Sequence, residues 1–235
     1  MRPILKRELQ SYFTTPVGYV FMGVFLLLTS VMFYVELLSP RSSDLLTFIG
    51  EMSYLWMLLA PVLTMRLLAE EKQRRTDQLL LTTPVSLPGI VAGKYLAAVL
   101  VMLLTVLLTG GYVLIIALYG AVYPGEVFCG YLGFVLQGCA FLAVDLYISA
   151  IMPGQATAAV GSFGLNLALW MMDLLASSAP EWLGDVLSFF SLYSRNEPFL
   201  MGQLSFASIG YDLTIALAFL AMTVHALDRQ RFRGR

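Results

Sequence analysis

Long runs of apolar residues constrain this chain more than any other feature. Six segments, at about residues 17–37, 46–66, 94–118, 128–150, 155–175 and 208–227, approach the roughly 20 apolar residues that a helix needs to cross a bilayer core. Only 12% of the residues are charged, and the mean hydropathy is +0.79. We therefore expect an all-α membrane protein in which residues 1–235 form a single transmembrane domain with six transmembrane helices.

The Lys and Arg residues fall almost entirely on one side of such a six-span arrangement. They precede the first span, lie between the second and third, or follow the last: Arg2, Lys6, Arg7, Arg66, Lys72, Arg74, Arg75, Lys94, Arg229, Arg231, Arg233 and Arg235. Cytoplasmic loops retain Lys and Arg, so we expect both termini in the cytoplasm. The first apolar run is too long for a cleaved signal peptide and is predicted to be a retained span.

Two segments outside the spans have the pattern of interfacial helices. Residues 2–15 place apolar residues at helical spacing opposite basic and polar ones, which predicts a helix on the cytoplasmic membrane surface; a solvated basic tail is the alternative. Pro16 and Gly18 are expected to end it. The apolar but interrupted segment 177–206 predicts short external helices between spans five and six. Gly110-Gly111 is expected to mark a bend or a close packing point in the third span.

A charged segment stands out between spans two and three. The stretch RLLAEEKQRRTDQLLLTTPVS, Arg66 to Ser86, has charges at its centre and leucines at both ends. Glu70/Arg74 and Glu71/Arg75 are spaced i,i+4, which favours a helix, and Pro84 would close it. Such a helix suits docking of another protein at the membrane edge. An ordinary solvated loop, whose charges only set the topology, is the alternative.

The order of residues in this segment resembles the first cytoplasmic loop of ABC type-2 permeases, particularly the gliding-motility-associated branch, with the pattern T-M-R-x-x-x-E-E-x-x-x-G-T-x-x-x-L-x-T-x-P-V. Ten positions fit: Thr64, Met65, Arg66, Glu70, Glu71, Thr76, Leu80, Thr82, Pro84 and Val85. The usual glycine is Arg75 here. The resemblance extends to K-R-E-L-x-x-Y-F-x-T-P (Lys6 to Pro16), the fourth and fifth spans and the C-terminal R-x-R-F-R.

This resemblance implies a permease subunit of an ATP-driven exporter in a bacterial plasma membrane, with the charged segment as a cytoplasmic coupling helix against a separate ABC ATPase subunit. The coupling residues it implies are Arg66, Glu70, Glu71, Lys72, Arg74, Arg75, Thr76, Asp77, Leu79, Leu80, Leu81, Thr82 and Pro84. The partner would bind ATP and Mg, so no cofactor is expected in this chain. Further expected partners are a second copy or a related permease, membrane lipid, and an accessory membrane or extracellular subunit; nucleic acid is not expected.

The chain itself is not expected to be an enzyme. A phosphate-binding loop requires G-x-x-x-x-G-K-[ST], and the nearest string, GIVAGKY from Gly89 to Tyr95, has one residue too few and a tyrosine at its end. An intramembrane protease would need two facing acids or a membrane Ser–His pair. Tyr211-Asp212 supplies only half of the first pattern, and His225 lies at the edge of a span. Cys129 and Cys139 are too far apart on one helix to pair, and no metal-binding spacing occurs.

Asp145 is the candidate pathway residue, because an acid within a span is costly and is functional by default. The structural alternative is that Asp145 lies near the interface, hydrated or bonded to a neighbouring helix. The alternative function is a non-transporting scaffold, or a subunit that transmits mechanical work from an ATPase partner.

Overall fold

The computed structural model describes residues 2–40, 42–73, 86–178, 180, 184 and 191–233. Within these residues the chain is all-helical, without strands. Five helical segments there are long and apolar enough to cross a membrane: Pro16–Leu38, Leu45–Gln73, Leu87–Tyr119, Pro124–Ile151 and Phe206–Arg231. They correspond to α2 with the short π-helix η1 (Tyr34–Leu38), α3 with α4, α6, α7 and α11. A further long helix, α8, spans Gln155–Ser178.

The N-terminal segment forms the predicted amphipathic helix, α1, over Arg2–Thr14. Thr15 then adopts an extended backbone conformation, and α2 (Pro16–Phe33) begins with its proline in the first turn. A Cβ at Gly18 would lie 2.6 Å from the Tyr12 carbonyl oxygen, so only glycine permits this tight passage. The break that Pro16 and Gly18 predict is therefore confirmed.

The central helix of the bundle is α7 (Pro124–Ile151), which packs against α3 (Leu45–Thr64), α8 and α11 (Phe206–Arg233). Trp56 of α3 is fully buried, and its ring meets those of Phe21, Phe25 and Phe134 edge-on. A Cβ at Gly138 would lie 2.7 Å from the Met102 sulfur, so the glycine lets α6 and α3 approach α7. Exposed apolar side chains lie mainly on α2, α6 and α11, as expected for lipid-facing helices.

The third predicted span is longer than expected. The helix α6 begins at Leu87 rather than near residue 94 and continues to Tyr119. The charge of Lys94 predicts that the span begins at the membrane–water interface near this residue. Its side chain is instead only 1% exposed and is ion-paired inside the protein. The helix is also unbroken at Gly110-Gly111, and a Cβ at either position would meet nothing within 4 Å. These glycines therefore do not form a close packing point within the described part of this chain.

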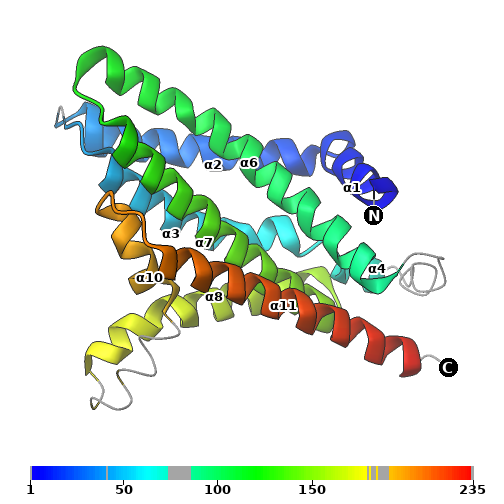
Figure 1. The fold of residues 1–235 in the computed structure, drawn as a ribbon. Helices are drawn as coiled ribbons and strands as arrows, with labels where there is room; N and C mark the ends of the chain where they lie inside the picture. The colour runs from blue at the N-terminus through cyan, green and yellow to red at the C-terminus, as the bar shows by residue number, and fades with distance from the viewer. Residues whose placement is uncertain are drawn as a thin grey trace.

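A short helix, α10 (Leu192–Leu200), covers α7 at the end of the bundle opposite α4 (Figure 1). Ser191 caps it by accepting a hydrogen bond from the Ser194 N–H. The Asn196 amide donates to Gln137 Oε1 of α7 at 2.9 Å. A short helix therefore lies within 177–206, where short external helices are expected; most of residues 179–190 lie outside the described part of the chain.

Both termini and α4 (Ala69–Gln73) lie toward the same end of the bundle, opposite α10 (Figure 1). This arrangement places the amphipathic α1, the short α4 and the basic end of α11 together. The candidate site is built at this end.

Candidate functional site

The spacing of the charged segment predicts one helix that begins at Arg66, but the structure differs. The helix α3 ends at Thr64, a turn covers Met65–Leu68, and α4 starts at Ala69. The backbone N–H groups of Leu68 and Ala69 donate to the buried Ser149 hydroxyl of α7, at 3.3 and 3.1 Å. Because a side chain on another helix accepts these bonds, the helical hydrogen-bond ladder is interrupted here.

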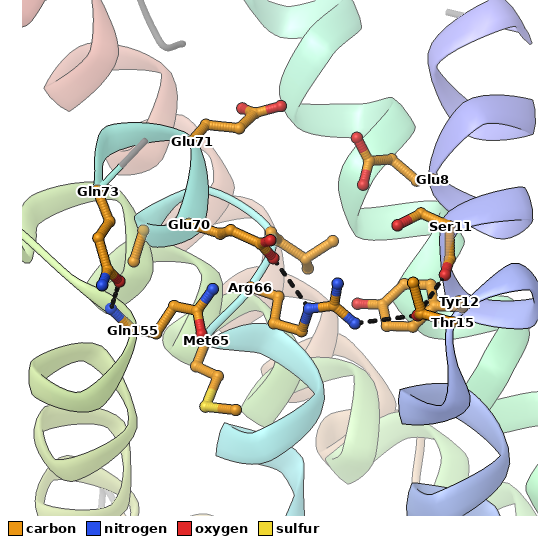
Figure 2. A network of polar contacts seen from close by, with 12 residues as sticks. Glu8, Ser11, Tyr12, Thr15, Met65, Arg66, Glu70, Glu71, Gln73 and Gln155 are labelled. Atoms are coloured by element: carbon orange, nitrogen blue, oxygen red, sulfur yellow. Dashed lines mark hydrogen bonds and ion pairs between the residues drawn. The ribbon is translucent and has the colours of Figure 1, made fainter. Parts of the chain in front are cut away.

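An ion-paired cluster joins α4 to α1 and α6. Lys94 of α6 lies 3.0 Å from both Glu8 of α1 and Glu71 of α4, and its ammonium also donates to the Leu67 carbonyl oxygen. Arg7 of α1 lies 2.8 Å from both carboxylates. Glu8 and Glu71 point toward each other from their two helices (Figure 2). Two cations and two carboxylates from three helices therefore balance one another.

Burial and neighbouring charges shift the pKa of the Glu8 carboxyl group in opposite directions. Burial alone raises the pKa of its carboxyl group, but the charges and hydrogen bonds of Lys94 and Arg7 outweigh burial and hold that pKa below its ordinary value. The hydrogen bond from Arg7 to Glu8 raises the pKa of the Arg7 guanidinium in turn. Glu8 is therefore a carboxylate at neutral pH and requires its cations.

A second contact joins α4 to the α1–α2 connection. Arg66 Nε donates to Glu70 Oε2 at 2.9 Å, and its Nη1 donates to the Thr15 hydroxyl at 3.2 Å (Figure 2). The buried Tyr12 hydroxyl donates to the Leu63 carbonyl oxygen at 2.8 Å. A Cβ at Gly93 would lie 3.1 Å from Ile4, so α1 also packs closely on α6. Polar and apolar contacts thus fix the whole length of α1.

The other side of α4 contacts the connection between α7 and α8. The Lys72 ammonium donates to the Ala150 carbonyl oxygen, and Gln73 Oε1 accepts from the Gln155 N–H at 3.3 Å (Figure 2). The Gln230 amide of α11 donates to the same Ala150 carbonyl at 2.9 Å. A displacement of α4 would therefore act on α1, α6, α7 and α8 together.

The structure brings Arg66, Glu70, Glu71 and Lys72, which sequence analysis singled out, into this network. The remaining predicted coupling residues lie outside the described residues: Arg74, Arg75, Thr76, Asp77, Leu79, Leu80, Leu81, Thr82 and Pro84. Sequence reasoning missed Arg7, Glu8 and Lys94 as site residues. The position of Lys94 between spans two and three indicates topology, but a lone lysine among the apolar residues 87–119 also signals a buried ion pair.

Asp145 lies apart from this network, on α7. Its side chain is fully buried, and it faces Thr64 of α3 together with Ser162 and Asn166 of α8. Neither carboxylate oxygen has a hydrogen-bond partner within the described residues. Its predicted role in a transport pathway stays a prediction. No group of three or more His, Cys, Asp or Glu that could hold a metal ion occurs in the described parts of the chain.

These features define a multi-pass, all-helical membrane protein with a charged segment braced against four helices at one end. The family model described as "ABC-2 family transporter protein" matches residues 8–227, and the chain belongs to this family. It is therefore a membrane permease subunit of an ABC transporter, a class that is typically non-enzymatic, and membership implies an ABC ATPase subunit as its partner. A comparison with curated proteins gave no match.

Proposed function

We propose that this permease subunit couples ATP hydrolysis by a separate ATPase subunit to export, and that α4 with the residues after it receives the motion. The observation that carries the proposal is the position of Glu71, which bonds both Arg7 of α1 and Lys94 of α6. A segment that only set the topology would not need to be braced against several helices. Two copies, or one copy with a related permease, would enclose the path.

The contacts support a division of roles along the segment. The Glu70 and Glu71 side chains are 15% and 18% exposed and face cations of this chain. They would transmit motion within the permease. Residues 74–84, with Arg74 and Arg75 as polar contacts and Leu79, Leu80 and Leu81 as the apolar anchor, would dock on the ATPase. Closure of two ATPase subunits would then move α4, and the attached helices would alternate access to the path.

The proposed topology has six spans, with α8 as the fifth. At 24 residues, α8 is roughly 36 Å long, which exceeds a bilayer core of about 30 Å. Residues 1–235 would then form one transmembrane domain with both termini on the side rich in Lys and Arg, which is the cytoplasmic side of a plasma membrane. A bacterial source and the gliding-motility branch rest on the sequence resemblance and remain part of the proposal.

The test is a charge reversal in the complex reconstituted with its ATPase subunit. In the Glu70→Lys/Glu71→Lys variant Arg7, Arg66 and Lys94 would face new cations, so we expect stimulation of ATP hydrolysis by the permease to be lost. Membrane insertion should be unchanged, because both substitutions lie in α4, after the apolar helix α3. Glu126→Lys is the matched control, since Glu126 is exposed at the start of α7, at the opposite end of the bundle. Normal stimulation in the double variant would refute the proposal.

A further inference from the structure

A groove lies between α7 and α11, the two helices that run side by side toward the C-terminal end of the chain (Figure 1). Its volume is about 940 Å³. Tyr147 and Ile151 of α7 form one wall, and Met222, His225 and Arg229 of α11 line the other. The groove is separate from the ion-paired cluster of α1, α4 and α6.

The groove changes from apolar to basic along its length. Ile151 and Met222 are 42% and 44% exposed, and they present apolar surface to whatever fills the groove. Arg229 follows Met222 by seven residues, so its Cα is about 10 Å further along the helix. An exposed apolar wall that ends in a cation matches the boundary between hydrocarbon and water.

The sequence of α11 places this boundary at Arg229. No Asp, Glu, Lys or Arg occurs between Asp212 and Asp228, whereas Asp228, Arg229 and Arg231 follow in close succession. Lipid headgroups would therefore meet the helix at this point. This reasoning holds whichever side of the membrane faces the cytoplasm.

The cation at the end of the groove is available to a ligand. Arg229 is exposed, and within the described residues no carboxylate of this chain forms a salt bridge with it. Asp228, its neighbour, does not line the groove. The adjacent Gln230 amide donates to the Ala150 carbonyl oxygen at 2.9 Å, which joins the end of α11 to the end of α7. The end of α11 that carries Arg229 is thus held against the end of α7.

We propose that this groove binds one anionic phospholipid, with its phosphate on Arg229 and His225 and an acyl chain along Ile151 and Met222. A guanidinium binds phosphate oxygens through paired, charge-assisted hydrogen bonds, and basic pockets between transmembrane helices bind acidic headgroups. An inorganic anion would leave the apolar wall uncovered. A second copy of the chain would bury the Arg229 guanidinium and would have to supply an acid for it.

The test uses the purified permease without any ATPase, so its outcome is independent of the proposed coupling function. Delipidated protein is titrated with phosphatidylglycerol or with phosphatidylcholine, and bound lipid is counted by native mass spectrometry. We expect one phosphatidylglycerol per chain, bound at least about tenfold more tightly than phosphatidylcholine, because the choline cation offsets the phosphate charge and would be repelled by Arg229.

Two variants and a matched control locate the lipid. Arg229→Gln should weaken phosphatidylglycerol binding about tenfold, while Arg231→Gln, an equal charge change at an exposed residue outside the groove, should leave it unchanged. Ala226→Trp keeps every charge but fills the groove and should displace the lipid.

Three results would overturn the proposal. Equal weakening by Arg229→Gln and Arg231→Gln would mean diffuse attraction to basic residues. No preference for phosphatidylglycerol would exclude a site for an anionic phospholipid. A lipid-free dimer that dissociates in Arg229→Gln would show that a second copy fills the groove.

Discussion

The Nζ atom of Lys94 on α6 lies 3.0 Å from Oε1 of Glu71 on α4, and the Lys94 side chain is only 1% exposed. The same ammonium lies 3.0 Å from Glu8 of α1. One buried cation therefore joins the amphipathic helix, the charged segment and a membrane-spanning helix. Burying a charge is costly without a partner, so the three helices depend on one another for their positions.

Replacing Lys94 should destabilise the packing of α1, α4 and α6. Lys94→Met keeps the apolar stem but removes the buried ammonium that pairs with both Glu8 and Glu71, so we expect a loss of stability on the order of 3 kcal/mol. The measurement is the thermal unfolding midpoint in detergent. Lys6→Met, the same change at an exposed lysine of α1, is the control and should have little effect. Adding Glu71→Gln to Lys94→Met should restore part of the loss; an unchanged midpoint in Lys94→Met would contradict the account.

The contribution of Glu8 to the stability of the fold should be lost at acidic pH. Its pKa lies below the ordinary value of 4.5 because Lys94 and Arg7 outweigh the effect of burial. A lowered pKa in the folded state means that the stabilisation is complete above pH 4.5 and is lost as the pH falls through the folded-state pKa. The unfolding midpoint of the wild type should exceed that of Glu8→Gln at neutral pH, and the difference should shrink below pH 4.5. A difference that is constant with pH would show that Glu8 contributes through packing alone.

The contact between α10 and α7 depends on Gly133. A Cβ there would lie 2.6 Å from both Asn196 Oδ1 and Phe199 Cβ. Gly133→Ala should therefore destabilise the protein by about 1–3 kcal/mol, as overpacking does. Gly110→Ala is the matched control, because a Cβ at Gly110 meets nothing within 4 Å. Equal unfolding midpoints for the two variants would show that α10 is not held in the described position.

Asp145→Asn tests the pathway hypothesis. The substitution keeps the size of the side chain and removes its ability to carry charge, so we expect export to fall while insertion and the unfolding midpoint are retained. Asp228→Asn makes the same chemical change near the end of α11, away from the buried surroundings of Asp145, and this variant should export normally. Normal export by Asp145→Asn at normal expression would remove Asp145 from the pathway.

Five of the six expected spans and the N-terminal helix could be predicted because hydrophobic length and helical periodicity are local properties of the sequence. The predicted helix over residues 2–15 corresponds to Arg2–Thr14, and the predicted second span 46–66 corresponds to Leu45–Thr64. The start of α6 could not be predicted, because the charge of Lys94 is balanced by Glu8 and Glu71 from distant parts of the sequence.

The interruption before α4 was missed for a similar reason. The spacing of residues 66–75 favours a continuous helix, but the Ser149 hydroxyl of α7 accepts the backbone bonds of Leu68 and Ala69. Contacts between distant segments also determine which predicted residues share a site. Arg66 and Glu70 face each other through local i,i+4 spacing, whereas Glu71 finds its partners on α1 and α6.

The central claim is that this permease works with a separate ATPase through the segment that includes α4. The most direct measurement is to purify the affinity-tagged chain from its native locus in mild detergent and to identify copurifying proteins by mass spectrometry. The account predicts a subunit with an ATP-binding Walker motif at comparable stoichiometry, and its loss in an Arg74→Glu/Arg75→Glu variant. Reproducible absence of such a subunit, from an intact and correctly inserted chain, would contradict it.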